Sequence, residues 1–106
     1  MKCGRCLYGE ILLREELLRK NKIYHNVGLE YYKITNEKEN ELKNDNIKYG
    51  IEVVKKEYIN NEIKQENSII EELTSSEKKV ENILEKLKNN AVTPTTLEYV
   101  IADMFT

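Results

Sequence analysis

The sequence predicts an α+β fold, with an N-terminal antiparallel meander of three to four strands followed by two C-terminal helices packed on the sheet. Two patterns carry this prediction. Apolar residues recur with helical spacing in the last third of the chain, whereas in the middle third they alternate with polar residues, as in strands. A meander of this size is not stable without a covering layer, so we expect the helices to bury one face of the sheet.

The first third of the chain fits two kinds of element. Its large apolar residues would line one side of a helix, but they also fit a strand with apolar groups on both faces. These residues are Ile11, Leu12, Leu13, Leu17 and Leu18. Intrinsic propensity favours a helix over 10–20. Residues 20–28 then suggest a turn and a short return, which suits a hairpin.

Two runs in the middle of the chain predict strands. Residues 29–35 are rich in residues that favour β-structure. Across 47–56, Tyr49, Ile51 and Val53 alternate with Lys, Gly and Glu, which is the period of a strand with one buried face.

The segments around these two runs predict their connections. Residues 36–46 are polar apart from one Leu and predict an exposed loop. Asn60-Asn61 suits a tight turn, after which residues 63–70 can return as a further antiparallel strand. Gly50 is isolated within a strand, where a glycine marks a bulge or a place where a helix packs closely.

The clearest helix is predicted over 76–89. Its apolar stripe has the spacing i, i+3, i+4 and i+7 and consists of Val80, Ile83, Leu84 and Leu87. Thr74 and Glu77 fit a capping box at its start, and Asn89-Asn90 can adopt the left-handed conformation at its end.

A second helix is predicted over 94–105. Thr93 suits the N-cap, and Pro94 suits the first helical position because its missing N–H would be unpaired there. Apolar residues again recur with helical spacing, at Leu97, Val100, Ile101, Met104 and Phe105.

The second half of the chain carries a distinctive order of residues. It contains Tyr49-Gly50-Ile51-Glu52-Val53, a polar turn, a Ser-Ser-Glu helix start and then Asn90-x-Val92-Thr93-Pro94-x-x-Leu97-x-x-Val100-x-x-Asp103. Over about residues 10–105 this resembles a family of short proteins of unknown function from spore-forming, low-GC Gram-positive bacteria. The resemblance implies a sheet followed by two helices, which moves the expectation for 10–20 to a strand. It implies no known reaction and no catalytic residues. Residues 1–9 are then a flexible N-terminal extension to a single α+β domain over 10–106.

The composition narrows the classes of function. With 40% hydrophobic residues and a net charge of −2, the chain is too apolar and too weakly charged for a disordered protein. Since it contains no run of ~18 apolar residues and opens on no signal-peptide pattern, we expect one soluble cytoplasmic domain without a membrane partner. Non-specific nucleic-acid binding needs concentrated positive charge, which no segment provides.

Cys3 and Cys6 form the motif with the most chemical potential. Two thiolates can occupy two sites on a tetrahedral Zn²⁺ or exchange with a disulfide. A closed zinc site needs four ligands, and His25 is the one further good ligand in the sequence. We therefore expect a metal at Cys3 and Cys6 only if two chains share it. His25, which has no evident Ser or Cys partner, is expected in a surface loop.

These observations favour a non-enzymatic binding or regulatory protein that acts through protein–protein contacts, with another protein or a second copy as its partner. The sequence contains no nucleophile–base pair, complete metal site or cofactor loop, so no cofactor is expected. The candidate surface is the sheet face away from the helices, with whichever of Tyr31 or Tyr32 and of Val53 or Val54 points outward. Two alternatives remain: a zinc-linked or thiol-switch regulator that uses the cysteines, and a nucleic-acid-associated factor that stacks bases on tyrosines.

Overall fold

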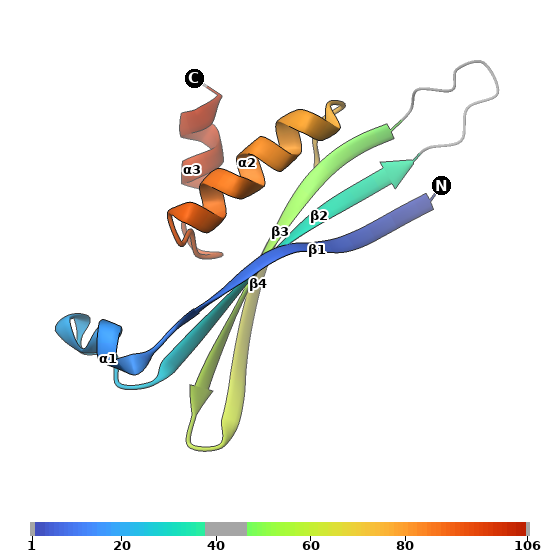
Figure 1. Cartoon of the computed structure of the whole chain (residues 1–106). Coiled ribbons are helices and arrows are strands. Elements are labelled where there is room, and N and C mark those ends of the chain that lie inside the picture. The colour runs from blue at the N-terminus through green and yellow to red at the C-terminus, as the bar shows by residue number, and fades with distance from the viewer. Residues whose placement is uncertain (1, 38–46, 106) are drawn as a thin grey trace, which may run out of the picture.

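The computed structural model describes residues 2–37 and 47–105, which form one antiparallel sheet and two C-terminal helices (Figure 1). The strands are β1 (Lys2–Leu13), β2 (Asn26–Glu37), β3 (Ile47–Ile59) and β4 (Glu62–Thr74), in the spatial order β1-β2-β3-β4. A short helix α1 (Glu15–Leu18) and a 3₁₀ turn η1 (Arg19–Asn21) connect β1 to β2, and α2 (Glu77–Asn89) and α3 (Leu97–Met104) follow β4. The predicted α+β fold is confirmed.

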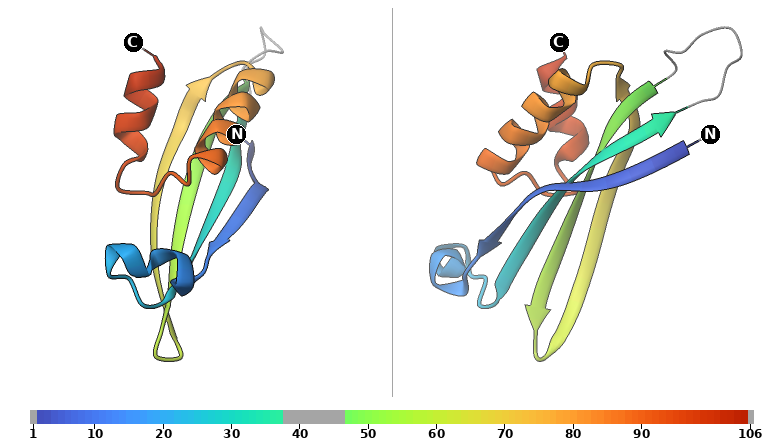
Figure 2. Two further views of the ribbon diagram at one scale, coloured as in Figure 1. Left: turned by 60° about the vertical axis from the view of Figure 1, so that its left-hand side comes forward. Right: turned by 45° about the vertical axis from the view of Figure 1, so that its right-hand side comes forward.

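Helices α2 and α3 both lie over one half of the sheet, and the β3–β4 hairpin extends beyond them (Figures 1 and 2). The core forms where the apolar stripe of α2 meets the inward-facing residues of the central strands. Its fully buried members from β2 and β3 are Leu29, Tyr31, Ile51 and Val53, and those from α2 are Val80, Leu84 and Leu87. The alternation in the strands and the helical spacing in α2 therefore point at the same core, as the sequence predicts.

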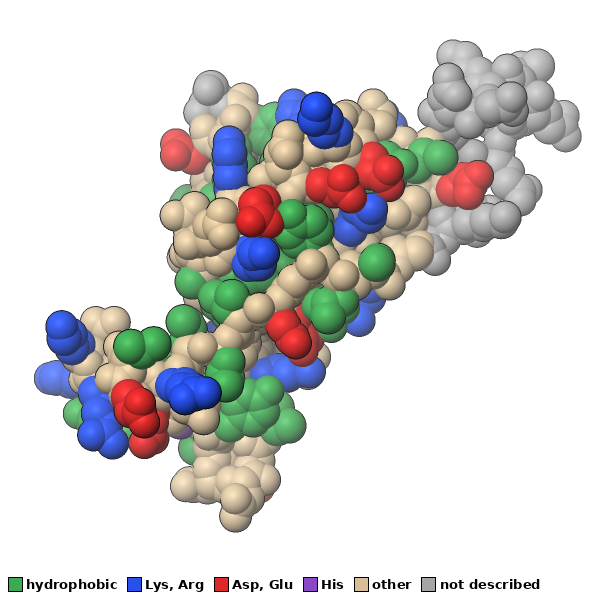
Figure 3. All heavy atoms as spheres, in the orientation of Figure 1, with side chains coloured by type: hydrophobic (Ala, Val, Ile, Leu, Met, Phe, Trp, Pro, Cys, Tyr) green, Lys and Arg blue, Asp and Glu red, His purple; other side chains and the backbone are tan. Residues whose placement is uncertain are grey.

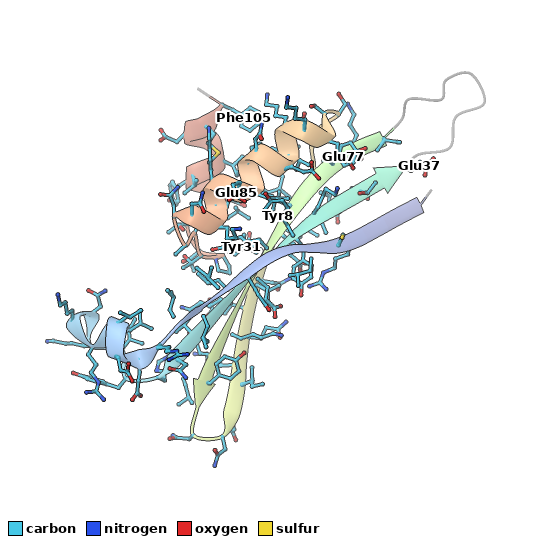
Figure 4. All side chains as sticks on the ribbon, viewed as in Figure 1. Tyr8, Tyr31, Glu37, Glu77, Glu85 and Phe105 are labelled. Atoms are coloured by element: carbon cyan, nitrogen blue, oxygen red, sulfur yellow. The ribbon has the colours of Figure 1, made fainter. Side chains whose placement is uncertain are left out.

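Tyr31 connects the sheet to the segment between α2 and α3. Its hydroxyl donates a hydrogen bond of 2.9 Å to the backbone carbonyl of Val92, beneath the helices (Figure 4). Burial raises the pKa of Tyr31 to about 12. A buried hydroxyl needs such a partner, since burying it unpaired would destabilise the fold.

The N-terminal strand differs from the sequence prediction. Residues 2–9 are not a separate extension, because β1 begins at Lys2 and pairs with β2 along its whole length. The reason is non-local: the long edge of β2 offers backbone groups that residues 2–13 satisfy, whatever their own propensity. The strand predicted over 10–20 ends at Leu13, and α1 begins at Glu15.

Two of the predicted turn features are confirmed. Asn60 and Asn61 connect β3 to β4 with φ values of 51° and 66°, the left-handed pair that a tight hairpin turn requires. Gly50 lies at a bulge between β3 and β4, where an added Cβ would come within 2.0 Å of the carbonyl oxygen of Ile70. The loop predicted over 36–46 lies outside the described residues except for Asn36 and Glu37, which end β2.

The ends of the helices need three corrections. Ser76, not Thr74, is the N-cap of α2, since its side chain accepts a hydrogen bond from the Lys79 N–H at 3.2 Å. After α2 the left-handed residue is Ala91, with φ of 49°, rather than an Asn. Helix α3 begins at Leu97 rather than Pro94, because residues 93–96 form a separate turn in which the Thr96 N–H bonds the carbonyl of Thr93.

Candidate interaction surface

The sheet has a second face on which none of the described helices packs, here called the open face. Its residues follow from the register of the strands. Tyr32 lies opposite Leu7 of β1 and Glu52 of β3, and Glu52 in turn lies opposite Ile69 of β4. Since side chains alternate between the two faces of a strand, every second residue before and after this row also belongs to the open face. In β1 the register shifts between Leu7 and Gly9, so the alternation continues with Glu10 and Leu12, which lie opposite Glu30 and Gly28.

A pair of charges lies on the open face beside Tyr32. Arg5 Nε donates to Glu52 Oε1 at 2.5 Å, and the Asn67 amide donates to the other carboxylate oxygen at 2.9 Å. The Arg5 guanidinium also lies over the Tyr32 ring, 3.6 Å from its centroid. The hydrogen bond to Glu52 raises the pKa of Arg5, which therefore stays charged. These contacts join β1, β2, β3 and β4 on this face.

A second set of polar contacts lies beside the first. Glu30 accepts a hydrogen bond from the Tyr32 hydroxyl at 2.8 Å and from the Lys56 ammonium at 3.1 Å. Burial opposes ionisation of Glu30, but these two donors outweigh it, so the pKa of Glu30 lies below its ordinary value. The hydrogen bond to Glu30 also raises the pKa of Lys56. Both groups are therefore ionised at neutral pH and bound to each other, which makes Glu30 a poor general base.

Large apolar side chains stand exposed around these polar contacts. Five of the nine exposed large hydrophobic residues in the described part of the chain belong to the open face. Three of them lie at the turn end of the β3–β4 hairpin and form the hairpin-end patch, which consists of Leu12, Tyr58 and Ile63. Leu7 and Ile69 lie with Tyr32 in one row beneath the helices, and this row is the helix-end patch.

The open face also contains two hollows. A hollow of about 420 Å³ lies at the hairpin-end patch, between Leu12, Gly28 and Tyr58, and another of about 370 Å³ lies between Arg5, Ile34 and Ile69. Figure 3 shows hydrophobic side chains gathered on the part of the sheet that extends beyond the helices. Exposed apolar groups with a polar surround are typical of contact sites.

The four residues that the sequence predicts for a contact surface lie on different faces of the sheet. Tyr31 and Val53 face α2 and α3 and are fully buried, so they belong to the core and not to any surface. Tyr32 and Val54 point to the open face. Val54 is nevertheless only 1% exposed, since the side chains around it cover it. Of the four, Tyr32 is the residue that a partner could touch.

The cysteines and His25 lie far apart in the sheet. Cys3 and Cys6 lie opposite Asn36 and Lys33 on β2, so their α-carbons are separated by three residues of extended strand, or about 10 Å. A disulfide requires α-carbons within ~7 Å, so the two residues cannot form one while β1 is intact. The Cys6 thiol is exposed and free. No group of three or more metal-binding side chains occurs among the described residues.

His25 lies in the turn before β2, as the sequence predicts, but it is half-buried and has a carboxylate partner. It lies just before β2, about 25 Å along the sheet from Cys6, and its Nε2 lies 2.8 Å from Glu57 Oε2 on β3. Lys55 bonds the same carboxylate at 3.2 Å. The side chain thus belongs to a hydrogen-bonded cluster on the side of the sheet that faces the helices, and the sequence spacing of 32 residues gives no local sign of it.

A comparison with models of protein families identifies the family of this chain. A model described as a family of unknown function (DUF6514) matches residues 13–106. The chain belongs to this family. No curated protein and no solved structure matches the chain. The DUF6514 match begins at the last residue of β1, so the part of the open face built by Arg5 and Leu7 lies outside it.

Most of the open face of this DUF6514 protein could not be located from its sequence. Leu12, Tyr58, Ile63 and Ile69 are unremarkable in the sequence, although the alternation that places Tyr32 outward would place each of them on the same face once the strand pairing is known. The role of Arg5 on this face could not be predicted, because Arg5 reaches Glu52 across 47 residues of sequence.

Among the described helices, none is long and apolar enough to cross a membrane.

Proposed function

We propose that this DUF6514 protein is a non-enzymatic binding or regulatory protein of the bacterial cytoplasm, and that it acts through the open face of its sheet. The observation that carries the proposal is the gathering of exposed apolar side chains on this face, five of the nine in the described residues. A single exposed Leu or Ile needs no explanation, but several on one face are typical of a contact site.

The chemistry of the face supports binding rather than catalysis. Four of its charged side chains are bound to one another, Arg5 to Glu52 and Lys56 to Glu30, which leaves these groups without the free pair of acid and base that proton transfer needs. Tyr32 supplies apolar area at a small cost in side-chain entropy and keeps a polar tip, as aromatic residues at interfaces do.

The charge balance favours a protein partner over a nucleic acid. The chain carries 17 basic against 19 acidic residues, and on the open face Arg5 and Lys56 are already neutralised by carboxylates. Binding to phosphates depends on free positive charge that releases counterions. Tyrosines without such charge pack more favourably against the apolar groups of another protein.

Site-specific photo-cross-linking tests the proposal. A photoreactive amino acid placed at Ile69, on the open face, should give a discrete protein adduct in the cells that produce the protein. The matched control is the same amino acid at Tyr99, which is 80% exposed on α3. We expect no adduct from Tyr99, and we expect Leu12→Lys to remove the adduct from Ile69. Equal adducts from both positions, or none from Ile69, would contradict the proposed function.

A further inference from the structure

We propose that the occupant of the open face is a second copy of this chain, so that two sheets pack face to face with their helices outward. This inference rests on the proposed function, because it names the partner of the same surface. Four observations support it: the order of polar and apolar groups along the face, its charge, its size and the position of the helices.

The first observation is the order of groups along the strands. The helix-end patch and the hairpin-end patch are six residues apart on β4, from Ile69 to Ile63, which is about 20 Å. The polar contacts of Glu30 with Lys56 lie between them. The face therefore carries an apolar patch on each side of the Glu30–Lys56 pair, and the Arg5–Glu52 pair lies within the helix-end patch.

This order makes the face complementary to itself. Two faces in contact are related by a two-fold axis that lies in the plane between them. Whether that axis runs along the strands or across them, it sets an apolar patch against an apolar patch and the Glu30–Lys56 pair against the same pair of the second copy. Symmetric dimers require such a self-complementary surface.

The second observation is that charge does not oppose the pairing. Both signs occur on the face, and Arg5–Glu52 and Lys56–Glu30 are paired within each chain. The net charge of the whole chain is only −2. These four groups of a second copy are therefore already neutralised and do not repel the first copy. The apolar patches can then supply the attraction between the two chains.

The third observation is the size of the face. Strands of 12 and 13 residues are about 40 Å long, and four strands at ~4.8 Å spacing are about 19 Å wide. The resulting area of roughly 750 Å² is close to the ~800 Å² that each partner buries in a specific interface. The fourth is that α2 and α3 lie on the opposite face, so they do not obstruct a second sheet at the usual distance of about 10 Å (Figure 2).

Sedimentation equilibrium of the full chain tests this inference. At micromolar concentrations we expect a mass twice the 12.5 kDa of one chain. Ile69→Lys and Ile63→Lys place a charge in each patch and should each shift the protein to the mass of one chain. Tyr99→Lys, a change to Lys at a more exposed position on α3, should leave the dimer intact. Circular dichroism and urea unfolding verify that each variant is folded.

The dimer should also show little dependence on salt. Its attraction is apolar, and Arg5–Glu52 and Lys56–Glu30 are paired within each chain. Raising the salt concentration should therefore leave the fraction of dimer within about twofold, whereas a dimer held by exposed ion pairs would dissociate. Dissociation by salt would overturn the apolar pairing described here.

Two outcomes separate this inference from the proposed function. A monomeric wild-type protein that still cross-links to a different protein at Ile69 overturns the pairing of two copies and leaves the proposed function standing. A dimer that survives both Ile69→Lys and Ile63→Lys associates through another surface, such as the edge of β1, and overturns the pairing. A monomer without any adduct at Ile69 overturns both.

Discussion

At the scale of single residues, Gly50 is the position that the backbone leaves without room for a side chain. An added Cβ would lie 2.0 Å from the carbonyl oxygen of Ile70 and 2.4 Å from that of Glu71, so the bulge between β3 and β4 would have to move. We expect Gly50→Ala to lower the free energy of unfolding by about 2–4 kcal/mol in urea titrations.

Gly4 offers the matched control for this change. An added Cβ there would meet only the Thr35 side chain at 3.8 Å, an ordinary contact. Gly4→Ala should therefore change the free energy of unfolding by no more than about 0.5 kcal/mol. Equal effects of the two substitutions would show that the close approach at Gly50 does not limit the fold.

Glu30 predicts a dependence of stability on pH. Its pKa is lower in the folded chain, because hydrogen bonds from Tyr32 and Lys56 outweigh the effect of burial. Its contribution to stability is therefore present above the ordinary Glu pKa of about 4.3 and is lost as the pH falls through the folded value. Between pH ~7 and ~3.5, wild-type protein should lose more free energy of unfolding than Glu30→Gln.

Urea titrations at both pH values measure this difference. Glu98→Gln, on the exposed surface of α3, serves as the control for removing one carboxylate. If Glu30→Gln loses as much stability on acidification as wild-type protein, the hydrogen bonds to Glu30 contribute nothing to the fold.

At the scale of elements, α2 is the covering layer on which the sheet depends. Leu84 is fully buried between α2 and the strands. Leu84→Ala should lower the free energy of unfolding by about 2–5 kcal/mol, from lost burial and the cavity that remains. Leu17→Ala, at a site 70% exposed in α1, should change it little. A Leu84→Ala protein as stable as wild type would remove α2 from the core.

The elements also show what the sequence could and could not predict. Helix α2 was predictable because its spacing is local: Val80, Ile83, Leu84 and Leu87 form the same stripe in any context. The start of α3 was not, because a Thr before Pro94 suits both a helix N-cap and the separate turn that forms here. The N-terminal end of β1 is not predictable from the sequence, because Cys3-Gly4-Arg5-Cys6 contains no β-pattern and its conformation depends on pairing with β2.

At the scale of the whole molecule, residues 2–9 contribute to both faces of the fold. Arg5 pairs with Glu52 on the open face, and the Tyr8 hydroxyl donates to Glu85 of α2 at 2.7 Å on the other (Figure 4). The sequence predicts a flexible extension here, whereas the structure predicts that a chain shortened to residues 10–106 unfolds at a clearly lower urea concentration.

This truncation has two specific controls. Arg5→Ala and Tyr8→Phe each remove one of the two contacts and leave β1 in place. We expect each to destabilise the protein less than the truncation, because the paired backbone of β1 remains. An unchanged unfolding midpoint in the shortened chain would show that β1 adds no stability.

The candidate surface is only partly predictable, because residues from several strands contribute to it. Tyr32 and Val54 follow from alternation along their strands, but Val54 is covered by side chains that converge from other strands. The contact of Arg5 with Glu52 depends on the register of β1, β2 and β3 together. Alternation predicts which way a residue points, and only the assembled sheet decides what lies above it.

The bulge in β1 bears on how this protein avoids uncontrolled assembly. Between Leu7 and Gly9 the register shifts, and Tyr8 turns toward Glu85 of α2. No described strand pairs with the outer edge of β1, so a regular strand of 12 residues there would offer an unbroken template for further chains to add to. The bulge interrupts that template in its middle. At this edge, a chain that pairs through its face is thereby less able to grow, strand by strand, into an amyloid-like fibre.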